Sequence, residues 1–250
     1  MTSQGSTGQP KYQRIADALR TAVQSGEYGP GDRLPGENDL MATYDVARMT
    51  ARQALGLLQS EGLAQAQDGG VFVRTFKPLR RRGIERLAQE RWGSGRSVWS
   101  ADTEDRELVV DQVEVREEAV GRLADALGLS AGSRVWVRSR RFVLDGKPVL
   151  FATSYLPSDV VADSAITRAD TGPGGTYARL AELGHGPVHF REEIRCRMPS
   201  ADEAERLSLS LGTPVVQIVR TAFAEGGRAV EVNEMTLDSA SYVLEYEFDA

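Results

Sequence analysis

The sequence predicts an α+β protein in two parts, a small helical part followed by a larger part built on an antiparallel sheet. Three observations support this. Within residues 10–75, three segments carry apolar residues at helical spacing, and two short β-rich runs with a Gly-rich turn follow them. From residue 98 to residue 248, β-rich runs dominate and helical stretches are short. The segment 76–97, which we expect to be a basic linker with a short helix, separates the two patterns.

The helical part begins after residues 1–9, a small polar stretch typical of a disordered tail. In YQRIADALRTAVQSG, one helix face is apolar and Gly26 ends the run. That face is formed by Tyr12, Ile15, Leu19 and Val23. The turn-rich stretch EYGPGDRLPG follows, and a second, short helix can start at Glu37.

The third helix is predicted in RMTARQALGLLQSEG, residues 48–62, where an apolar face consists of Ala51, Ala54, Leu55 and Leu58. Arg48 and Arg52 are four residues apart and share the opposite face. A guanidinium fork fits guanine O6 and N7, and it fits a phosphate equally well. Taken alone, this helix is more typical of a solvated surface than of a DNA contact. With a helix and a turn before it and AQAQDGGVFVRT after it, the pattern favours a winged helix-turn-helix that binds double-stranded DNA.

The stretch GDRLPGENDLMATYDVARMTARQALGLLQSEGL, with DGGVFV after it, resembles the DNA-binding domain of GntR-type transcription regulators over about residues 10–75. The resemblance implies contacts to phosphates and base edges, and a wing tip at Gly69 that approaches the minor groove. The DNA-contacting residues expected from it are Arg33, Asn38, Arg48, Thr50, Arg52 and Gly69.

Two departures from the family pattern concern helix N-caps. Gly36 and Ala47 stand where the family usually has serine. Glycine is a tolerable N-cap, whereas alanine costs about 0.5–2 kcal/mol relative to serine. We expect the fold to survive, because packing supplies most helix stability in a protein.

The second part is read as an antiparallel sheet with helices. RELVVDQVEVR and SRVWVRSRRFVL are β-rich, and GKPVLFATSYLP follows them after an Asp145-Gly146 turn. TYARLAELG predicts a short helix, VHFREEIRCRM a strand and SADEAERLSLSLG a capped helix. The last hairpin, PVVQIVRTAFAEGGRAVEVNEMTL, turns at Gly226-Gly227.

Residues 98–248 resemble the UTRA domain of the HutC subgroup of GntR regulators. The matching stretches are RRFVLDGKPVLFATSYLP, SADEAERLSLSLGTPVVQIVRTAF and GGRAVEVNEMTL. The resemblance implies a fold like that of chorismate lyase, a pocket that binds a small-molecule effector, and dimerisation through this domain. The effector-binding residues expected from it are Arg140, Phe142, Tyr177 and Glu231.

Several pocket positions depart from those of the sugar-phosphate sensors in this subgroup. Phe142 stands in place of the second arginine of a phosphate clamp, and Ala152 in place of a glutamate. Gly175 and Leu237 likewise replace a serine and a tyrosine. The sequence therefore favours a more apolar ligand with one anionic or polar group, which Arg140 and Glu231 would contact. The strand pattern alone fits Arg140 equally well as a surface residue.

Composition bounds the remaining possibilities. The net charge is −6, but residues 76–100 carry seven basic and two acidic residues, so a DNA contact would depend on the placement of a few arginines. One cysteine, Cys196, fits a reducing compartment, and its place in a strand predicts a buried thiol. There is no long apolar run and no signal-peptide pattern, so we expect a cytoplasmic protein with no membrane contact.

We therefore expect a homodimeric transcription regulator, a repressor that a small-molecule effector releases from a palindromic operator, with no cofactor. The alternative is an enzyme that uses the lyase-like second part. The sequence shows no activated nucleophile or acid/base pair in support of it. His185 and His189 are four residues apart, but Gly186 and Pro187 between them prevent a helix, so no metal site is expected.

Overall fold

The computed structural model describes residues 9–83, 85–88, 98–99, 103, 106–209 and 212–248. The chain forms two compact units, the first mainly from residues up to Lys77 and the second mainly from residues from Pro78 onward. None of the described helices is long and apolar enough to cross a membrane. Residues 1–8 of the expected disordered tail and residues 84 and 89–97 of the expected linker segment lie outside the described residues.

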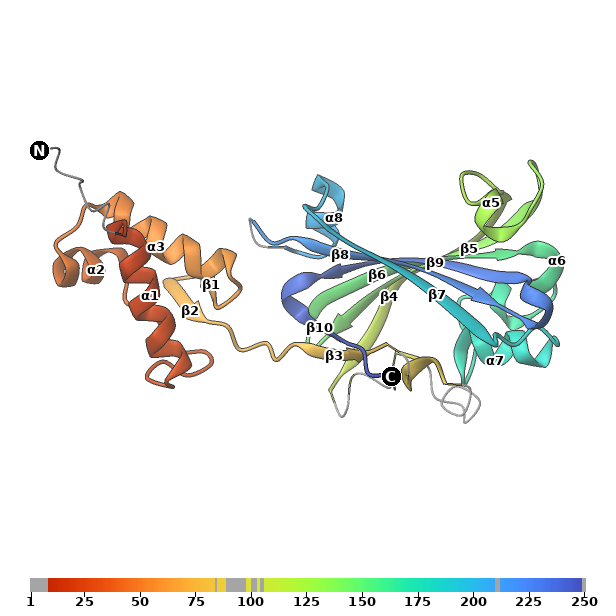
Figure 1. Ribbon diagram of the computed structural model, residues 1–250, viewed down its shortest axis with the longest axis horizontal. Helices are drawn as coiled ribbons and strands as arrows, with labels where there is room; N and C mark the ends of the chain where they lie inside the picture. The colour runs from red at the N-terminus through yellow and green to blue at the C-terminus, as the bar shows by residue number, and fades with distance from the viewer. Residues whose placement is uncertain are drawn as a thin grey trace, which may run out of the picture. The chain divides into compact units, whose positions relative to one another are not determined.

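The first unit has the predicted order of three helices and a hairpin: α1 (Lys11–Gln24), α2 (Glu37–Tyr44), α3 (Arg48–Ser60), β1 (Ala64–Gln67) and β2 (Gly70–Val73) (Figure 1). The predicted apolar face of α3 is buried, and it packs on Ile15 and Leu19 of α1 and on Leu40 of α2. The hairpin pairs antiparallel, with Gly69 at its tip in the left-handed region at φ 91°. This is the winged helix-turn-helix expected from the sequence.

The N-caps of α2 and α3 differ as the sequence indicates. At α2, the Asp39 carboxylate accepts the backbone N–H of Gly36 at 2.9 Å, which supplies half of a capping box. At α3, Ala47 has the extended backbone of an N-cap (φ −68°, ψ 151°) but no side-chain hydrogen bond. The helix that carries Arg48 and Arg52 therefore begins without a side-chain cap.

Ala47→Ser is expected to stabilise α3 by about 1 kcal/mol, because a serine hydroxyl at this position can accept an orphan N–H of the first turn. Hydrogen exchange of the α3 amides should slow by about fivefold if they exchange through local opening. Ala42→Ser, at an exposed position inside α2, is the control for the substitution itself and should give no such slowing. Equal exchange in wild type and Ala47→Ser would show that this N-cap is not a weak point.

The second unit is built on a six-stranded sheet in the order β4-β5-β6-β9-β8-β7, with every neighbouring pair antiparallel. The strands are β4 (Leu108–Ala119), β5 (Arg134–Leu144), β6 (Lys147–Pro157), β7 (His189–Arg197), β8 (Val215–Phe223) and β9 (Ala229–Asp238). Two predicted turns join neighbouring strands. Asp145-Gly146 connects β5 to β6 with φ values of 48° and 77°, and Gly226-Gly227 connects β8 to β9 with φ values of 73° and 79°.

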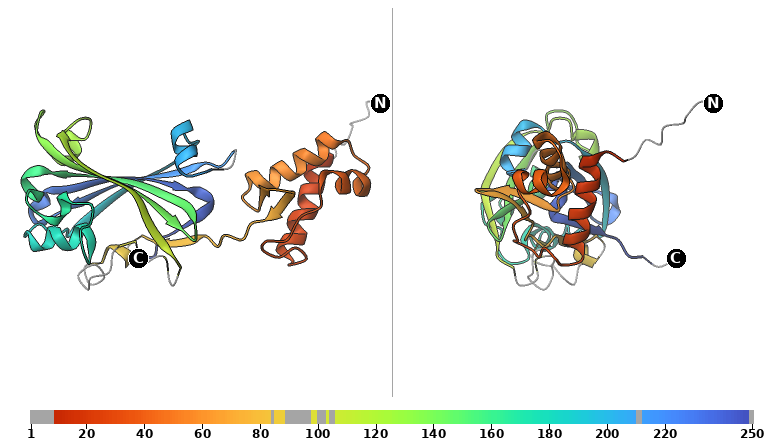
Figure 2. Two further views of the ribbon diagram at one scale, coloured as in Figure 1. Left: turned by 180° about the vertical axis from the view of Figure 1, so that it is seen from behind. Right: turned by 90° about the vertical axis from the view of Figure 1, so that its left-hand side faces the viewer.

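Short helices flank this sheet: α5 (Ala124–Leu127), α6 (Ser158–Val161), α7 (Gly175–Glu182) and α8 (Ala201–Arg206). Both views show α5 and α8 on one side of the sheet and α7 on the other (Figures 1 and 2). The side chains of β5 alternate between two environments. Val135 and Val137 pack with Leu127 of α5, whereas Arg138, Arg140 and Phe142 line a cavity that α7 also borders.

The segment expected to be a basic linker is partly a strand, which corrects that expectation. Strand β3 (Leu79–Arg82) pairs in parallel with β10 (Tyr242–Glu245), more than 160 residues later in the sequence. Burial alternates along β3: Leu79 and Arg81 are buried, whereas Arg80 and Arg82 are exposed and both pair with Glu245. Since every arginine of the run RRR takes part in an ion pair inside the second unit, with Arg80 and Arg82 sharing one carboxylate, the run is not a free polycation.

Strand β7 is the second correction. Its residue Cys196 is exposed, not buried as expected. Strand β7 is at the edge of the sheet, and among the described residues no element covers this face of it. Cys196 shares the face with Ile194 and Met198, which are 39% and 59% exposed, so the alternation does not bury the three side chains.

Candidate DNA-binding surface and ligand pocket

Helix α3 of the first unit presents two arginines to solvent. The side chains of Arg48 and Arg52 are each 61% exposed, and both lie opposite the buried leucines, as predicted. Met49, between them in the first turn, is 60% exposed and was not singled out from the sequence. A helix with an exposed cationic face and an apolar face in the core matches the geometry of a recognition helix.

Glu37 of α2 holds both arginines. Its carboxylate accepts hydrogen bonds from Arg52 Nε at 2.7 Å and Arg52 Nη2 at 3.3 Å, and Arg48 Nε lies 3.8 Å away. The hydrogen bond from Arg52 keeps the pKa of Glu37 below its ordinary value. Glu37 thus stays ionised at neutral pH and orients the two guanidinium groups before any nucleic acid arrives.

The other predicted DNA-contacting residues divide into two groups. Arg33, Asn38 and Arg48 line one groove, where Arg48 Nη2 donates to Asn38 Oδ1 at 3.0 Å. Thr50, Arg52 and Gly69 do not line this groove. Gly69 is exposed at the wing tip with open space around it, and a side chain at the next glycine, Gly70, would collide with Arg33 Nε at 2.8 Å.

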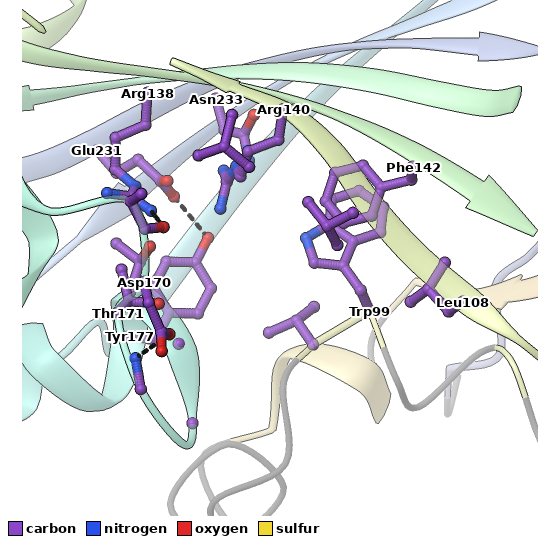
Figure 3. Close-up of a pocket in the computed structure, with 18 of the residues that line it drawn as sticks. Trp99, Leu108, Arg138, Arg140, Phe142, Asp170, Thr171, Tyr177, Glu231 and Asn233 are labelled. Carbon is purple, nitrogen blue, oxygen red and sulfur yellow. Dashed lines mark hydrogen bonds between the residues drawn. The ribbon is translucent and has the colours of Figure 1, made fainter. Parts of the chain in front are cut away.

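In the second unit, all four predicted effector-binding residues line one cavity of about 450 Å³ (Figure 3). Phe142 belongs to its apolar end, where the ring of Trp99 packs against it in a tilted arrangement at a centroid distance of 4.4 Å and Leu108 lies close by. Arg140, Tyr177 and Glu231 belong to its polar end, toward the middle of the sheet. The cavity therefore suits a molecule with an apolar body and a polar head.

Tyr177 and Glu231 form a buried pair in the polar end. The Tyr177 hydroxyl donates to Glu231 Oε2 at 2.8 Å, and the two residues are 4% and 2% exposed. Burial, with the nearby Glu231 carboxylate, raises the pKa of Tyr177 well above its ordinary value, so the phenol remains a hydrogen-bond donor. Because the Tyr177 hydroxyl already donates its hydrogen bond to Glu231, the pair has only acceptor oxygens left for a ligand.

Arg140 faces the cavity, which resolves the choice left open by the sequence. Its Nη2 donates to Ser154 Oγ at 2.8 Å, whereas its buried Nε has no hydrogen-bond partner among the described residues. Burial lowers the pKa of Arg140, and the neighbouring charge of Arg220 acts in the same direction. A guanidinium that has lost its water and retains an unused donor is suited to bind an anion.

Arg138, two residues earlier on the same face of β5, has a different role. It is 1% exposed and donates to the backbone carbonyls of Ile166 (2.5 Å), Arg168 and Ala169 (3.0 Å). These carbonyls belong to the loop that leads into the cavity wall at residues 169–172. Arg138 therefore holds the wall in place.

Sequence reasoning missed three further cavity residues, Arg138, Arg220 and Asn233. Arg220 lies on β8 and Asn233 on β9. The only sequence signal for these two residues is strand alternation, which places Arg220 on the opposite face from Thr221 and Asn233 on the opposite face from Val232. Asn233 is 1% exposed, and its Oδ1 has no partner among the described residues. Trp99 also lines the cavity. Within the described part of the chain, no cluster of His, Cys, Asp or Glu could hold a metal ion.

Comparison with known families matches both units. The model of bacterial regulatory proteins of the gntR family covers residues 11–73, and the UTRA domain model covers residues 104–242. A relative, an HTH-type transcriptional regulator of Streptomyces coelicolor, is 32% identical over 249 residues, covering 96% of this chain and 93% of the relative. The chain belongs to the GntR family of transcription regulators and carries a UTRA domain.

Two other comparisons agree with this assignment. The HTH-type transcriptional repressor NagR of Bacillus subtilis is 25% identical over 225 residues, covering 89% of this GntR-family chain and 88% of NagR. The crystal structure of a GntR-family transcriptional regulator superposes with a TM-score of 0.65 at 26% identity, covering 97% and 98% of the two chains. PhnF of Mycobacterium smegmatis, at 21% identity and a TM-score of 0.58 over 94% and 99%, shares the fold.

The family membership gives the two sites their general roles. The first unit is the DNA-binding domain of a transcription regulator, and the second is its UTRA effector domain. The relatives are transcription regulators, so the alternative of an enzyme has no support among them.

Proposed function

We propose that this regulator, of the HutC subgroup, acts in the cytoplasm as a dimeric repressor that leaves a palindromic operator when an anionic small molecule enters the UTRA cavity. The observation that carries this proposal is the cationic polar end of the cavity, where Arg140 retains a buried, unused donor. The apolar end formed by Trp99 and Phe142 supports a ligand with an aromatic or aliphatic body. NagR, a relative, is named a repressor.

The DNA-binding part of the proposal assigns base reading to Arg48, Thr50 and Arg52. Because each subunit of a two-fold dimer reads one half-site, the operator should be an inverted repeat. Arg33 and Asn38 would contact phosphates, and the wing at Gly69 would approach the minor groove. Footprinting of the purified protein on the DNA just upstream of its own gene tests this function. A protected inverted repeat supports it; uniform weak binding to that DNA and to scrambled DNA contradicts it.

The dimer is proposed to form through the second unit. One winged domain with few basic residues should hold one half-site weakly, and joining two such domains raises the effective concentration of the second. The exposed edge strand β7, with Ile194 and Met198 uncovered in one chain, supports an interface in this unit. Sedimentation in physiological salt, without DNA, should show a dimer at micromolar concentration, and a monomer there would contradict the dimer.

Arg52→Ala is expected to weaken operator binding by about 1–3 kcal/mol and to relax discrimination at one base pair of each half-site. The reason is that Arg52 lies on the exposed face of α3, oriented by Glu37. Binding to operator and scrambled DNA, measured at one salt concentration, checks the ratio of the two affinities.

Two variants complete this experiment. Arg14→Ala removes an exposed arginine of α1 and should leave the specificity ratio unchanged. In Arg52→Ala, the Glu37 carboxylate loses its hydrogen-bonded partner and can repel the DNA phosphates. Glu37→Gln in the Arg52→Ala background removes this charge, so it separates lost base reading from added repulsion. An unchanged ratio in Arg52→Ala would show that Arg52 does not read a base.

A further inference from the structure

Arg220 of β8 is a second buried cation in the cavity. Its side chain is 2% exposed, and its buried Nε and Nη1 have no hydrogen-bond partner among the described residues. Its Cζ lies 5.4 Å from the centroid of the Tyr177 ring. Because a buried N–H group without a hydrogen-bond acceptor is costly, a guanidinium with two such groups inside a cavity indicates a binding position for an anion.

Behind Arg220 lies a buried carboxylate, Glu192 of β7. Arg220 Nη1 is 3.9 Å from Glu192 Oε1, too far for a hydrogen bond but close enough for a strong charge interaction. Glu192 is bound by Arg81 of β3 through Nη1 at 3.0 Å and through Nη2. The hydroxyl of Tyr246 also donates to Glu192, at 3.3 Å.

Two cations, Arg81 and Arg220, lie beside the Glu192 carboxylate. Burial opposes ionisation of Glu192, but the hydrogen bond from Arg81 and the charges of Arg81, Arg220 and Arg86 outweigh it, so the pKa of Glu192 lies below its ordinary value. Glu192 is therefore ionised, and it attracts both Arg81 and Arg220. The side chains of Arg81 and Glu192 are 0% and 10% exposed, so water screens these charge interactions poorly.

We propose that an anion bound at Arg220 and the docking of strand β3 through Arg81 are coupled and favour each other. The coupling rests on the proposed function in one respect, that the cavity takes an anionic ligand. An anion at Arg220 competes with Glu192 for that guanidinium and leaves the carboxylate to Arg81, which stabilises Arg81 in its docked position. By linkage, docked Arg81 offsets the charge of Glu192 and strengthens the attraction of Arg220 for the anion.

The position of β3 in the sequence gives this coupling a regulatory meaning. Leu79, its first residue, comes two residues after Lys77, where the first unit ends. Ligand binding would therefore fix the segment through which the DNA-binding unit is attached. A fixed attachment limits the distances that can separate the two recognition helices of a dimer. It therefore changes how well the two helices match the spacing of the half-sites.

The test is calorimetric titration of inorganic phosphate, as the probe anion, into the full-length protein. Arg81→Gln should weaken phosphate binding by roughly tenfold, although Arg81 does not line the cavity. Glu192→Gln should tighten it, because the variant removes a negative charge beside Arg220. Arg80→Gln is the matched control. Arg80 is the preceding residue on β3, is 62% exposed and pairs with Glu245, so this variant should bind phosphate like wild type.

Two further measurements separate coupling from a loss of folding. Arg81→Lys keeps the charge and should bind phosphate more tightly than Arg81→Gln. Hydrogen exchange of the β3 and β10 amides should slow several-fold with saturating phosphate in wild type, and should not respond in Arg220→Gln.

The outcomes distinguish this inference from the proposed function. Wild-type affinity in Arg81→Gln, or weaker binding in Glu192→Gln, overturns the coupling. If Arg140→Ala loses phosphate while Arg81→Gln retains wild-type affinity, the anionic pocket stands and the coupling alone is overturned. If wild type shows no saturable phosphate binding, both the anionic ligand class and the coupling are overturned.

Discussion

Arg138→Leu is expected to lower the free energy of unfolding of the second unit by about 3 kcal/mol. Leucine fills part of the same space but leaves the carbonyl of the buried Ile166 without its donor, which costs about 1–3 kcal/mol. It also removes the hydrogen bonds to the carbonyls of Arg168 and Ala169, two exposed residues. Part of this cost is offset because removing Arg138 also relieves a buried charge. Burial lowers the pKa of Arg138 to about 10, and the neighbouring Arg140 acts in the same direction.

Tryptophan fluorescence during urea unfolding measures this effect in the intact chain. All three tryptophans lie at residue 92 or beyond, so the signal reports the second unit. Arg168→Ala is the control, because it removes an exposed side chain while leaving the carbonyl that Arg138 contacts. If Arg138→Leu unfolds at the same urea concentration as Arg168→Ala, then Arg138 does not hold the cavity wall.

Arg140→Ala is expected to cost about 2–5 kcal/mol of affinity for an anionic ligand, the range for removing one partner of a buried, hydrogen-bonded charge pair. It should abolish the effect of that ligand on operator binding while leaving operator affinity nearly unchanged, because Arg140 belongs to the second unit. Arg141→Ala is the matched control. Its guanidinium binds Asp111 at 2.9 and 2.7 Å and does not line the cavity.

Linkage makes the Arg140 experiment reciprocal. If the ligand lowers operator affinity, the operator must lower ligand affinity by the same factor, which we expect to be about 1–3 kcal/mol. Titration of the ligand into free and operator-bound protein measures this factor. Equal affinities in the two titrations would mean that the UTRA domain does not control DNA binding through this cavity, and an Arg140→Ala protein that still responds would place the ligand elsewhere.

The first unit could be predicted almost completely from the sequence, because its determinants are local. Apolar residues at helical spacing define the buried face of α3, and the same spacing assigns Arg48 and Arg52 to the exposed face. The positions of Arg140 and Phe142 on one strand face also follow from alternation. That this face borders a cavity depends on α7 and β9, which tertiary packing brings together.

The charge cluster could not be predicted, since its members are far apart in the sequence. Arg81 pairs with Glu192, 111 residues later, and stands in a run of three arginines that is typical of a solvated segment. Burial of Arg81 depends on the pairing of β3 with β10, which no local pattern encodes. Cys196 shows the opposite error. Its alternation with apolar residues predicts burial, but a strand at the sheet edge has one face with nothing to cover it among the described residues.

The pairing of β3 with β10 also has a consequence for biosynthesis. Leu79 leaves the ribosome early, yet its partner Tyr242 is added 163 residues later. At about 5–20 residues per second, the growing chain waits roughly 10–30 s before this ladder can form. During that interval the local contacts of the first unit can form, while the cationic segment after it is unpaired. The attachment between the two units is therefore completed last, and early termination of translation before residue 242 would leave a DNA-binding unit that no ligand can control through β3.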